Sequence, residues 1–133
     1  MVLIEQCQDL GRQYPHLGAK IGSHGLNNLE ICTLGPGQRY YARWLDGTYS
    51  SWASDQANAA LTKCSNHGNG SKILAVALGY GDSYVISYGY RSNMKNLGYK
   101  YDLKGYYPSL YQFLKENEAN LSIIVSLRFH SAV

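Results

Sequence analysis

LEICTLGPGQRYYARW, the stretch from Leu29 to Trp44, recurs in a related form 44 residues later as ILAVALGYGDSYVISY, from Ile73 to Tyr88. The two stretches share a leucine, two glycines and a tyrosine at matching positions: Leu34, Gly35, Gly37 and Tyr40 in the first, and Leu78, Gly79, Gly81 and Tyr84 in the second. A shorter version, SIIVSLRF, runs from Ser122 to Phe129. A period of this size is typical of one supersecondary unit that is used several times.

Helical patterns precede the later copies. In SDQANAALTKC, from Ser54 to Cys64, apolar residues recur at the spacing that lines one face of a helix, and either Ser54 or Asp55 is the natural N-cap. In PSLYQFLKENEA, Pro108 suits a first helical turn, and the apolar stripe consists of Leu110, Phe113 and Leu114. The opening LIEQCQDLGRQ offers a similar stripe, which Gly11 weakens.

After each of the first two helices we expect a strand that ends in Leu-Gly-x-Gly, a second strand rich in tyrosine, and a hairpin return. The unit is helix-β-β-β, with repeat 1 at about 1–52, repeat 2 at about 53–105 and a truncated repeat 3 at about 106–133. This organisation predicts a single α+β domain, with a mainly antiparallel twisted sheet of about six to eight strands and two or three packed helices. We expect a last strand near residues 121–129 to pair with an earlier copy.

The Asp46-Gly47 pair predicts a two-residue hairpin turn of type I′. That turn would place Trp44 opposite Tyr49 on one face and Tyr41 opposite Trp52 on the other. Such cross-strand aromatic pairs contribute roughly 0.2–1 kcal/mol each, so we interpret them first as scaffold and second as a binding surface. The stretch WLDGTY, from Trp44 to Tyr49, is followed by a predicted helix and loosely resembles the aromatic-Asp-Gly repeats of accessory modules built from a hairpin and a helix. This resemblance implies no functional residue.

Composition argues against several partners. The chain has 133 residues, 13 tyrosines and a net charge of +3, without a long run of Lys or Arg, which argues against nucleic acid. The segment YRSNMKNLGYKYDLKG, from Tyr90 to Gly105, interleaves cations with rings, and an exposed hairpin explains it more simply than single-stranded nucleic acid does. No apolar run is long enough to cross a membrane. The three cysteines are an odd number without a paired spacing, which favours free thiols in a reducing compartment. The N-terminal segment contains acidic residues and does not resemble a signal peptide. We therefore expect an intracellular, cytoplasmic protein, if the chain is not a processed secreted one.

The sequence offers little catalytic chemistry. His16 precedes the segment LGAKIGSHG and His24 lies near its end; we interpret the segment as a glycine-rich loop, and the spacing of the two histidines matches no zinc pattern. Cys32 and Cys64 fall on expected apolar faces, where a thiol packs as a small hydrophobe. The Gly-x-Gly turns lead into strands, so they lack the helix terminus that binds phosphate. We therefore predict no metal and no cofactor.

The function most consistent with these patterns is a non-catalytic recognition module that binds a protein partner through a Tyr/Trp-rich strand and hairpin surface. The residues expected in this surface are Trp44, Tyr49, Trp52, Tyr88, Tyr90, Arg91, Tyr99 and Tyr101. One alternative is a carbohydrate-binding module with an aromatic stacking platform. Another is a small hydrolase or toxin-like enzyme that uses a histidine such as His24 or His130 with Cys or Ser. An incomplete third repeat would leave a sheet edge through which a homodimer could form.

Overall fold

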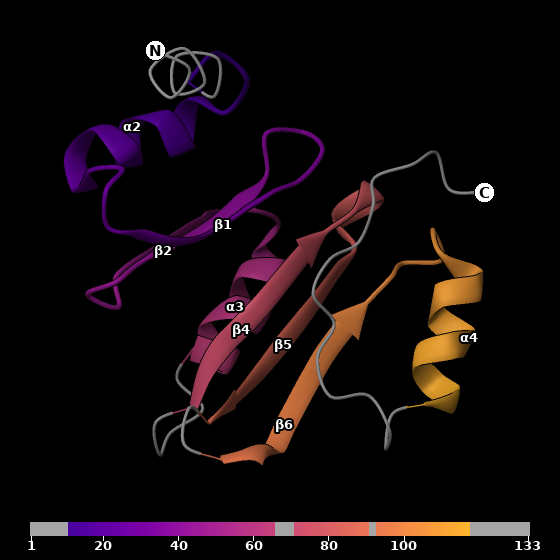
Figure 1. The fold of residues 1–133 in the computed structure, drawn as a ribbon. Coiled ribbons are helices and arrows are strands. Elements are labelled where there is room, and N and C mark those ends of the chain that lie inside the picture. The colour runs from indigo at the N-terminus through magenta and orange to yellow at the C-terminus, as the bar shows by residue number, and fades with distance from the viewer. Residues whose placement is uncertain (1–10, 66–70, 91–92, 118–133) are drawn as a thin grey trace. The chain divides into compact units, whose positions relative to one another are not determined.

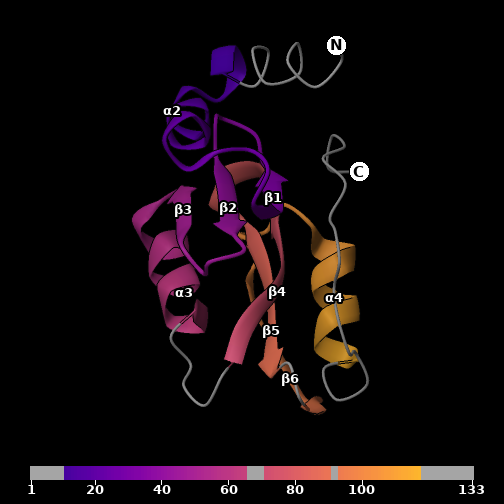
Figure 2. The same cartoon turned by 60° about the vertical axis from the view of Figure 1, so that its left-hand side comes forward.

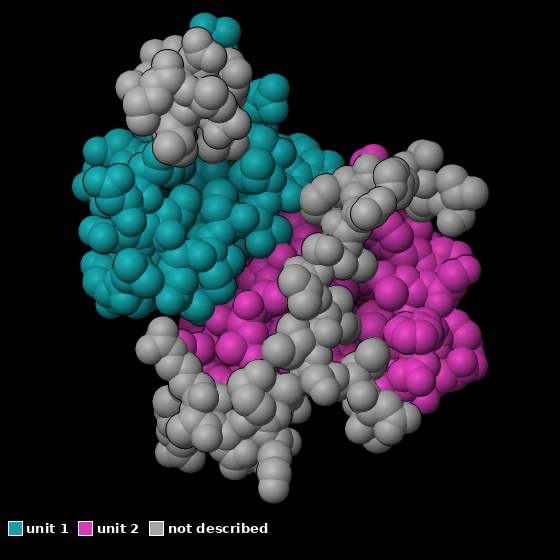
Figure 3. All heavy atoms as spheres, viewed as in Figure 1, with its two compact units in different colours: residues 1–53 teal, residues 54–133 magenta. Residues whose placement is uncertain are grey.

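The computed structural model describes residues 11–65, 71–90 and 93–117 (Figure 1). The chain divides into two compact units, residues 1–53 and 54–133 (Figure 3). The α+β class is confirmed, and so is the antiparallel pairing. In the described residues, however, six strands form two three-stranded sheets, in the orders β1-β2-β3 and β4-β5-β6, in place of the one larger sheet that we predicted. The expected strand at residues 121–129 lies outside the described residues.

The first unit contains α2 (Pro15–His24), β1 (Leu29–Leu34), β2 (Tyr40–Trp44) and β3 (Tyr49–Trp52). The interpretation of LGAKIGSHG as a loop is therefore wrong, because most of it is helix α2. Leu17 and Ile21 lie one turn apart and give α2 an apolar face despite its glycines. A Cβ at Gly18 would meet the Gly11 Cα at 2.8 Å, so that glycine permits a close backbone approach. The helix predicted in LIEQCQDLGRQ lies mostly outside the described residues.

The core of the first unit joins α2 to the sheet. Leu17 is fully buried against Tyr40, Ala42 and Trp44, whose side chains lie on one face of β2. The Trp44 indole N–H donates a 2.7 Å hydrogen bond to the carbonyl of Gly25, which follows the end of the helix. A helix C-terminus leaves carbonyls without intrahelical partners, so this bond ties the strand to the end of α2.

The second unit contains α3 (Asp55–Ser65), β4 (Ser71–Leu78), a 3₁₀ turn (Tyr80–Asp82), β5 (Tyr84–Tyr90), β6 (Asn93–Asp102) and α4 (Pro108–Glu116). Of the two predicted caps of α3, Ser54 is the one that forms, because its Oγ accepts a 3.2 Å hydrogen bond from the Ala57 N–H. Pro108 begins α4 as predicted. Phe113, which we placed on the buried stripe of that helix, is 51% exposed.

The two helices cover opposite faces of the β4–β6 sheet (Figures 1 and 2). Leu114 of α4 packs in a cluster with Ala77, Val85 and Leu103. Residues next to Val85 in β5 point to the other face, where α3 lies. Burial, with the nearby Asp102 and Cys64, raises the pKa of the Tyr84 hydroxyl on that second face. No helix in the described ranges is long and apolar enough to cross a membrane.

The first two strands of each sheet pair in the same register, at a constant offset of 44 residues. In the first sheet, Leu29 pairs with Trp44 and Ile31 with Arg43, and a register shift lies between the two pairs. In the second sheet the corresponding partners are Ile73 with Tyr88 and Ala75 with Ser87, again with a register shift between them. The β-bulge therefore falls at the same point of both ladders.

The turn that joins these two strands also has the same geometry in both sheets. The Gly35 N–H donates to the Arg39 carbonyl at 2.8 Å, and the Gly79 N–H donates to the Ser83 carbonyl at 2.9 Å. Positive φ angles occur at consecutive residues in each turn: Gly37 and Gln38 in the first, Gly81 and Asp82 in the second. Two consecutive left-handed residues are unusual, and in both turns they are the last glycine of the Leu-Gly-x-Gly motif and the residue after it.

Candidate functional site

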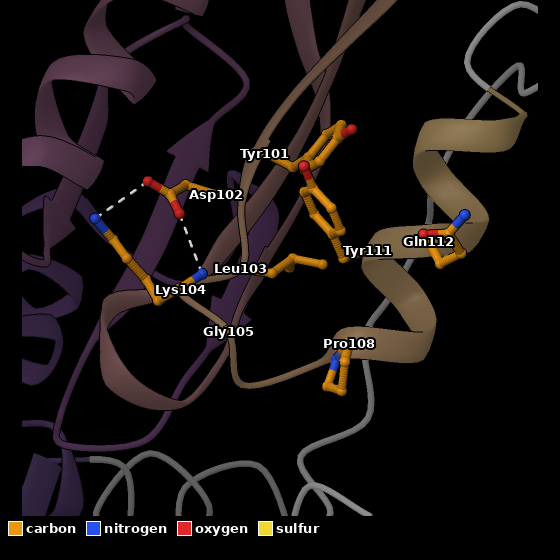
Figure 4. Close-up of a pocket in the computed structure, with 8 residues that line it drawn as sticks. All are labelled: Tyr101, Asp102, Leu103, Lys104, Gly105, Pro108, Tyr111 and Gln112. Atoms are coloured by element: carbon orange, nitrogen blue, oxygen red, sulfur yellow. Dashed lines mark hydrogen bonds and ion pairs between the residues drawn. The ribbon is translucent and has the colours of Figure 1, made fainter.

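The second unit has a groove between the end of β6 and the first turns of α4 (Figure 4). Its volume is about 510 Å³, within the range of small-ligand and side-chain pockets. Its lining comes from the strand, the loop that follows it and the helix: Tyr101, Asp102, Leu103, Lys104, Gly105, Pro108, Tyr111 and Gln112. We call this the β6–α4 groove.

Two tyrosines form the aromatic part of the β6–α4 groove. Tyr101 from β6 and Tyr111 from α4 meet edge to face, with ring centroids 6.2 Å apart (Figure 4). Tyr99 stacks beside Tyr101 at 6.0 Å and continues the row along the strand. Lys115 lies one turn beyond Tyr111, with its ammonium 5.6 Å from the centre of that ring. Tyr111 is 44% exposed, so its ring is accessible to a ligand without being part of the core.

The polar rim of the groove is an ion pair with matched charges. The Lys104 ammonium lies 3.1 Å from Asp102 Oδ2, and the Lys104 backbone N–H donates to Asp102 Oδ1 at 3.1 Å (Figure 4). The Gln56 side chain of α3 donates to Asp102 and accepts from Lys104. Because the two charges neutralise each other, the rim attracts neither a strongly acidic nor a strongly basic ligand.

The hairpin between β2 and β3 does not have the predicted register. Tyr40 pairs with Trp52 and Arg43 with Tyr49, one residue away from the expected alignment. The Gly47 N–H donates to the Trp44 carbonyl, and Gly47 has a φ of 90°, so the loop contains three residues and not two. A one-residue shift exchanges the partners across the strands. Trp44 and Trp52 therefore share a face, and neither of the predicted aromatic pairs forms.

The predicted site residues of the first unit have different environments. Trp44 is 2% exposed and belongs to the core. Trp52 is 47% exposed and stacks on the His16 ring, with centroids 3.6 Å apart. Tyr49 is 38% exposed, and its ring lies 6.0 Å from that of Tyr41. The structure thus places two of the three at the surface.

Of the predicted site residues in the second unit, two lie at the β6–α4 groove. Tyr101 lines it and Tyr99 lies next to Tyr101. The Tyr88 ring covers Gly98 on the neighbouring strand, because a Cβ at Gly98 would come within 2.7 Å of that ring. Only the backbone of Tyr90 is described, paired with Ser71 and Asn93. Arg91 lies outside the described residues.

Sequence reasoning missed the helical half of the groove. The sequence predicts a helix that contains Pro108, Tyr111 and Gln112, but these three residues are not among the predicted site residues. The helical period contained a signal, because Tyr107, Tyr111 and Lys115 follow each other at four-residue intervals. A row of polar-tipped rings on one side of a short helix differs from a purely apolar core stripe, and it could have marked this face as accessible.

The groups considered for catalysis do not lie at the groove. His24 Nδ1 lies 3.0 Å from Ser23 Oγ, and both residues are exposed at the end of α2. Burial raises the pKa of the Cys64 thiol and also that of the Cys32 thiol. Cys32 pairs with the buried Ala42 and so lies on the core face of its sheet as expected, but its residue as a whole is exposed whereas Cys64 is buried. His130 lies outside the described residues. Within the described ranges, no group of three or more His, Cys, Asp or Glu residues could hold a metal ion.

Comparison with models of protein families, with curated proteins and with solved structures gives no match.

Proposed function

We propose that the chain is a recognition module that binds a protein partner, with the β6–α4 groove as its central contact. The observation that carries this proposal is the pair of tyrosine rings contributed by different elements, Tyr101 from β6 and Tyr111 from α4. Exposed tyrosines beside a concave surface are typical of the residues that dominate binding energy at protein interfaces. The neutral Asp102–Lys104 rim favours an uncharged segment of the partner over a phosphate or a basic peptide.

We also propose that the two units are copies of one helix-β-β-β unit. The shared register, the shared bulge and the shared pair of positive φ angles support this proposal, as does the common order of one helix and three strands. Superposition of the two segments in an experimental structure would test it. If residues 29–44 and 73–88 follow different backbone paths there, the proposal is wrong.

The groove lies in a part of the second unit that has no counterpart in the first. The last strand of the first unit, β3, has 4 residues, whereas the last strand of the second, β6, has 10. Tyr99 and Tyr101 belong to this longer return, where the second unit departs from the first. Segments that vary between repeats are usually those that carry binding specificity, because the shared part is occupied with folding.

Tyr111 and Phe113 provide a matched test on one helix. Both are exposed on α4, at 44% and 51%, but only Tyr111 lines the groove. The intact chain would be immobilised to select binders from a phage-displayed random peptide library. The selected peptides would then be measured against the variants Tyr111→Ala and Phe113→Ala by biolayer interferometry. We expect Tyr111→Ala to weaken binding by about tenfold or more, and Phe113→Ala to change it by less than about threefold.

Circular dichroism would establish that both variants retain the fold. Equal losses in the two variants, or a failure to select any peptide, would contradict the proposal. A glycan array probed with the same two variants would distinguish the carbohydrate-binding alternative from binding to a protein partner. Binding to a sugar that is lost in Tyr111→Ala alone would keep the groove as the site but change the class of its ligand.

A further inference from the structure

Both tryptophans of the chain contact a histidine of the same helix. The sequence contains two tryptophans, Trp44 and Trp52. The ring of His16 stacks on Trp52, with centroids 3.6 Å apart and planes inclined by 15°. The ring of His24 lies over Trp44 at 4.8 Å with an inclination of 32°. The two histidines lie near opposite ends of α2, and their partners lie on β3 and β2.

Protonation changes the energy of such a ring pair. A neutral imidazole contacts indole through dispersion and weak quadrupole interactions. An imidazolium adds the attraction between a cation and the electron-rich face of indole, which is strongest for tryptophan. Histidine is the side chain that ordinarily changes its charge between about pH 5 and 8. Each contact should therefore tighten as the pH falls through this range.

The hydrogen bonds of His24 are compatible with both protonation states. Its Nδ1 lies 3.0 Å from Ser23 Oγ and 3.3 Å from the Lys20 carbonyl. An Nδ1–H group can donate to that carbonyl, which leaves Nε2 to gain or lose the second proton. Protonation at Nε2 therefore leaves the local hydrogen bonds in place and changes the interaction with Trp44.

The charged neighbours of the two histidines do not reverse this effect. On α2 and the segment before it, Arg12 and Lys20 lie four residues on either side of His16, and Lys20 also lies four residues before His24. All of these are exposed, so salt screens their repulsion. On the hairpin, strand β3 has no charged residue, and Asp46 in the turn attracts the charged form of His24. Arg43 of β2 forms its ion pair with Glu30 at 2.8 Å.

We propose that the two His–Trp contacts act as a pH-dependent latch between α2 and the β2–β3 hairpin. The latch is tighter at mildly acidic pH, where the imidazolium rings are attracted to the indoles. Its contribution decreases as the pH rises and the rings become neutral. This inference is independent of the β6–α4 groove, since every residue in it belongs to the first unit.

The tryptophan emission of the intact chain tests the proposal directly, because both fluorophores are involved. An imidazolium in contact with indole quenches its emission by accepting an electron from the excited state. We expect emission to fall when the pH is lowered from about 8 to about 5, the range in which an imidazole ordinarily gains its charge. His16→Gln and His24→Gln should each remove part of this decrease, and the double variant should abolish it. His67→Gln, at a position outside the described residues, is the control and should show the same decrease as the parent.

Urea unfolding provides a second readout that does not depend on quenching. The sign follows from the contacts: they favour the charged rings, so the stability added by the charge is present at low pH and is lost as the pH rises and the rings become neutral. The midpoint of the parent should exceed that of the double variant by more at about pH 5.5 than at about pH 7.5. An emission that stays constant across the range, or a midpoint difference that is equal or larger at the higher pH, would overturn the proposal.

Discussion

The β1–β3 and β4–β6 sheets have the same ladder but different final strands. Their first two strands share register, bulge and turn geometry at an offset of 44 residues. The first sheet then closes with a three-residue loop and the short strand β3. The second closes with β6, whose 10 residues end at the groove. The comparison indicates that the first two strands set the same register in both sheets, whereas the third strand is the part in which the two sheets differ.

The two units also use their helices differently. In the first unit, α2 lies on one face of its sheet through an aromatic core that contains Tyr40 and Trp44. In the second, α3 and α4 cover the two faces, and the cluster beneath α4 contains the smaller residues Ala77 and Val85. Tyr101 packs against this cluster from β6, and it lines the groove together with Tyr111 of α4.

The largest expected effect is the loss of a buried leucine in either unit. Leu17 of α2 is 0% exposed and Leu114 of α4 is 1% exposed. We expect Leu17→Ala and Leu114→Ala each to cost about 2–5 kcal/mol of unfolding free energy, because each leaves a cavity between a helix and its sheet. Urea unfolding followed by circular dichroism measures both. A cost below about 1 kcal/mol for either variant would mean that the helix does not pack on its sheet as described.

The shared turn permits a sharper comparison at Gly81 and Gly37. Both residues have positive φ, 61° and 70°, so a Cβ strains both backbones by about 1 kcal/mol. At Gly81 the Cβ would also overlap the Tyr106 ring, whereas at Gly37 its nearest neighbour is an Arg39 atom at 3.9 Å. We expect Gly81→Ala to cost about 2–3 kcal/mol and Gly37→Ala about 1 kcal/mol.

Thermal and urea unfolding of the two glycine variants would measure this difference. Adding Tyr106→Ala to Gly81→Ala should bring the cost back towards that of Gly37→Ala, because the overlapping ring is removed. If the double variant shows no such recovery, the ring contact is not the cause of the larger cost.

The smallest expected effect is at the hairpin turn. Asp46 Oδ1 accepts hydrogen bonds from the Thr48 hydroxyl at 2.6 Å and from its backbone N–H at 2.9 Å, and these bonds hold the pKa of the Asp46 carboxyl below its usual range. Thr48→Val should move that pKa back towards the usual range, as followed by NMR of the carboxyl carbon. The support from these bonds is present when the carboxyl is ionised and is lost as the pH falls through its titration. An unchanged pKa in the variant would contradict the hydroxyl contact.

The sequence predicted a helix correctly where its apolar spacing and its start signal both indicated the same helix. Helix α3 was identified from its apolar spacing and from Ser54, and the start of α4 from Pro108. Helix α2 was missed because Gly18 and Gly22 lower helix propensity, while the packing of Leu17 that compensates is a tertiary effect. The hairpin register was missed because Asp-Gly suits a two-residue loop and also a three-residue loop that ends in a left-handed glycine.

The candidate site depended on information that one strand or helix does not contain. Tyr99 and Tyr101 were expected in a binding surface, but their partner Tyr111 comes from a helix that packs on the sheet. Which ring of α4 faces the groove depends on how Leu114 is docked, and the helical period alone had placed Phe113 on the buried side. Trp44 was interpreted first as scaffold and is buried, and its burial depends on helix α2, which the sequence did not predict.

The two Leu-Gly-x-Gly turns receive their tyrosines from opposite directions along the chain. Tyr14, whose hydroxyl donates to the Gly35 carbonyl, comes 21 residues before it, whereas Tyr107, which accepts from the Tyr80 N–H, comes 27 residues after it. A ribosome extends a chain from its N-terminus at roughly 5–20 residues per second. Tyr14 is therefore already synthesised when the first turn is made. The second turn is synthesised before Tyr107, by a time on the order of seconds. During translation the first sheet can form its turn contact while the second sheet still lacks Tyr107, whose hydroxyl binds the backbone of its turn.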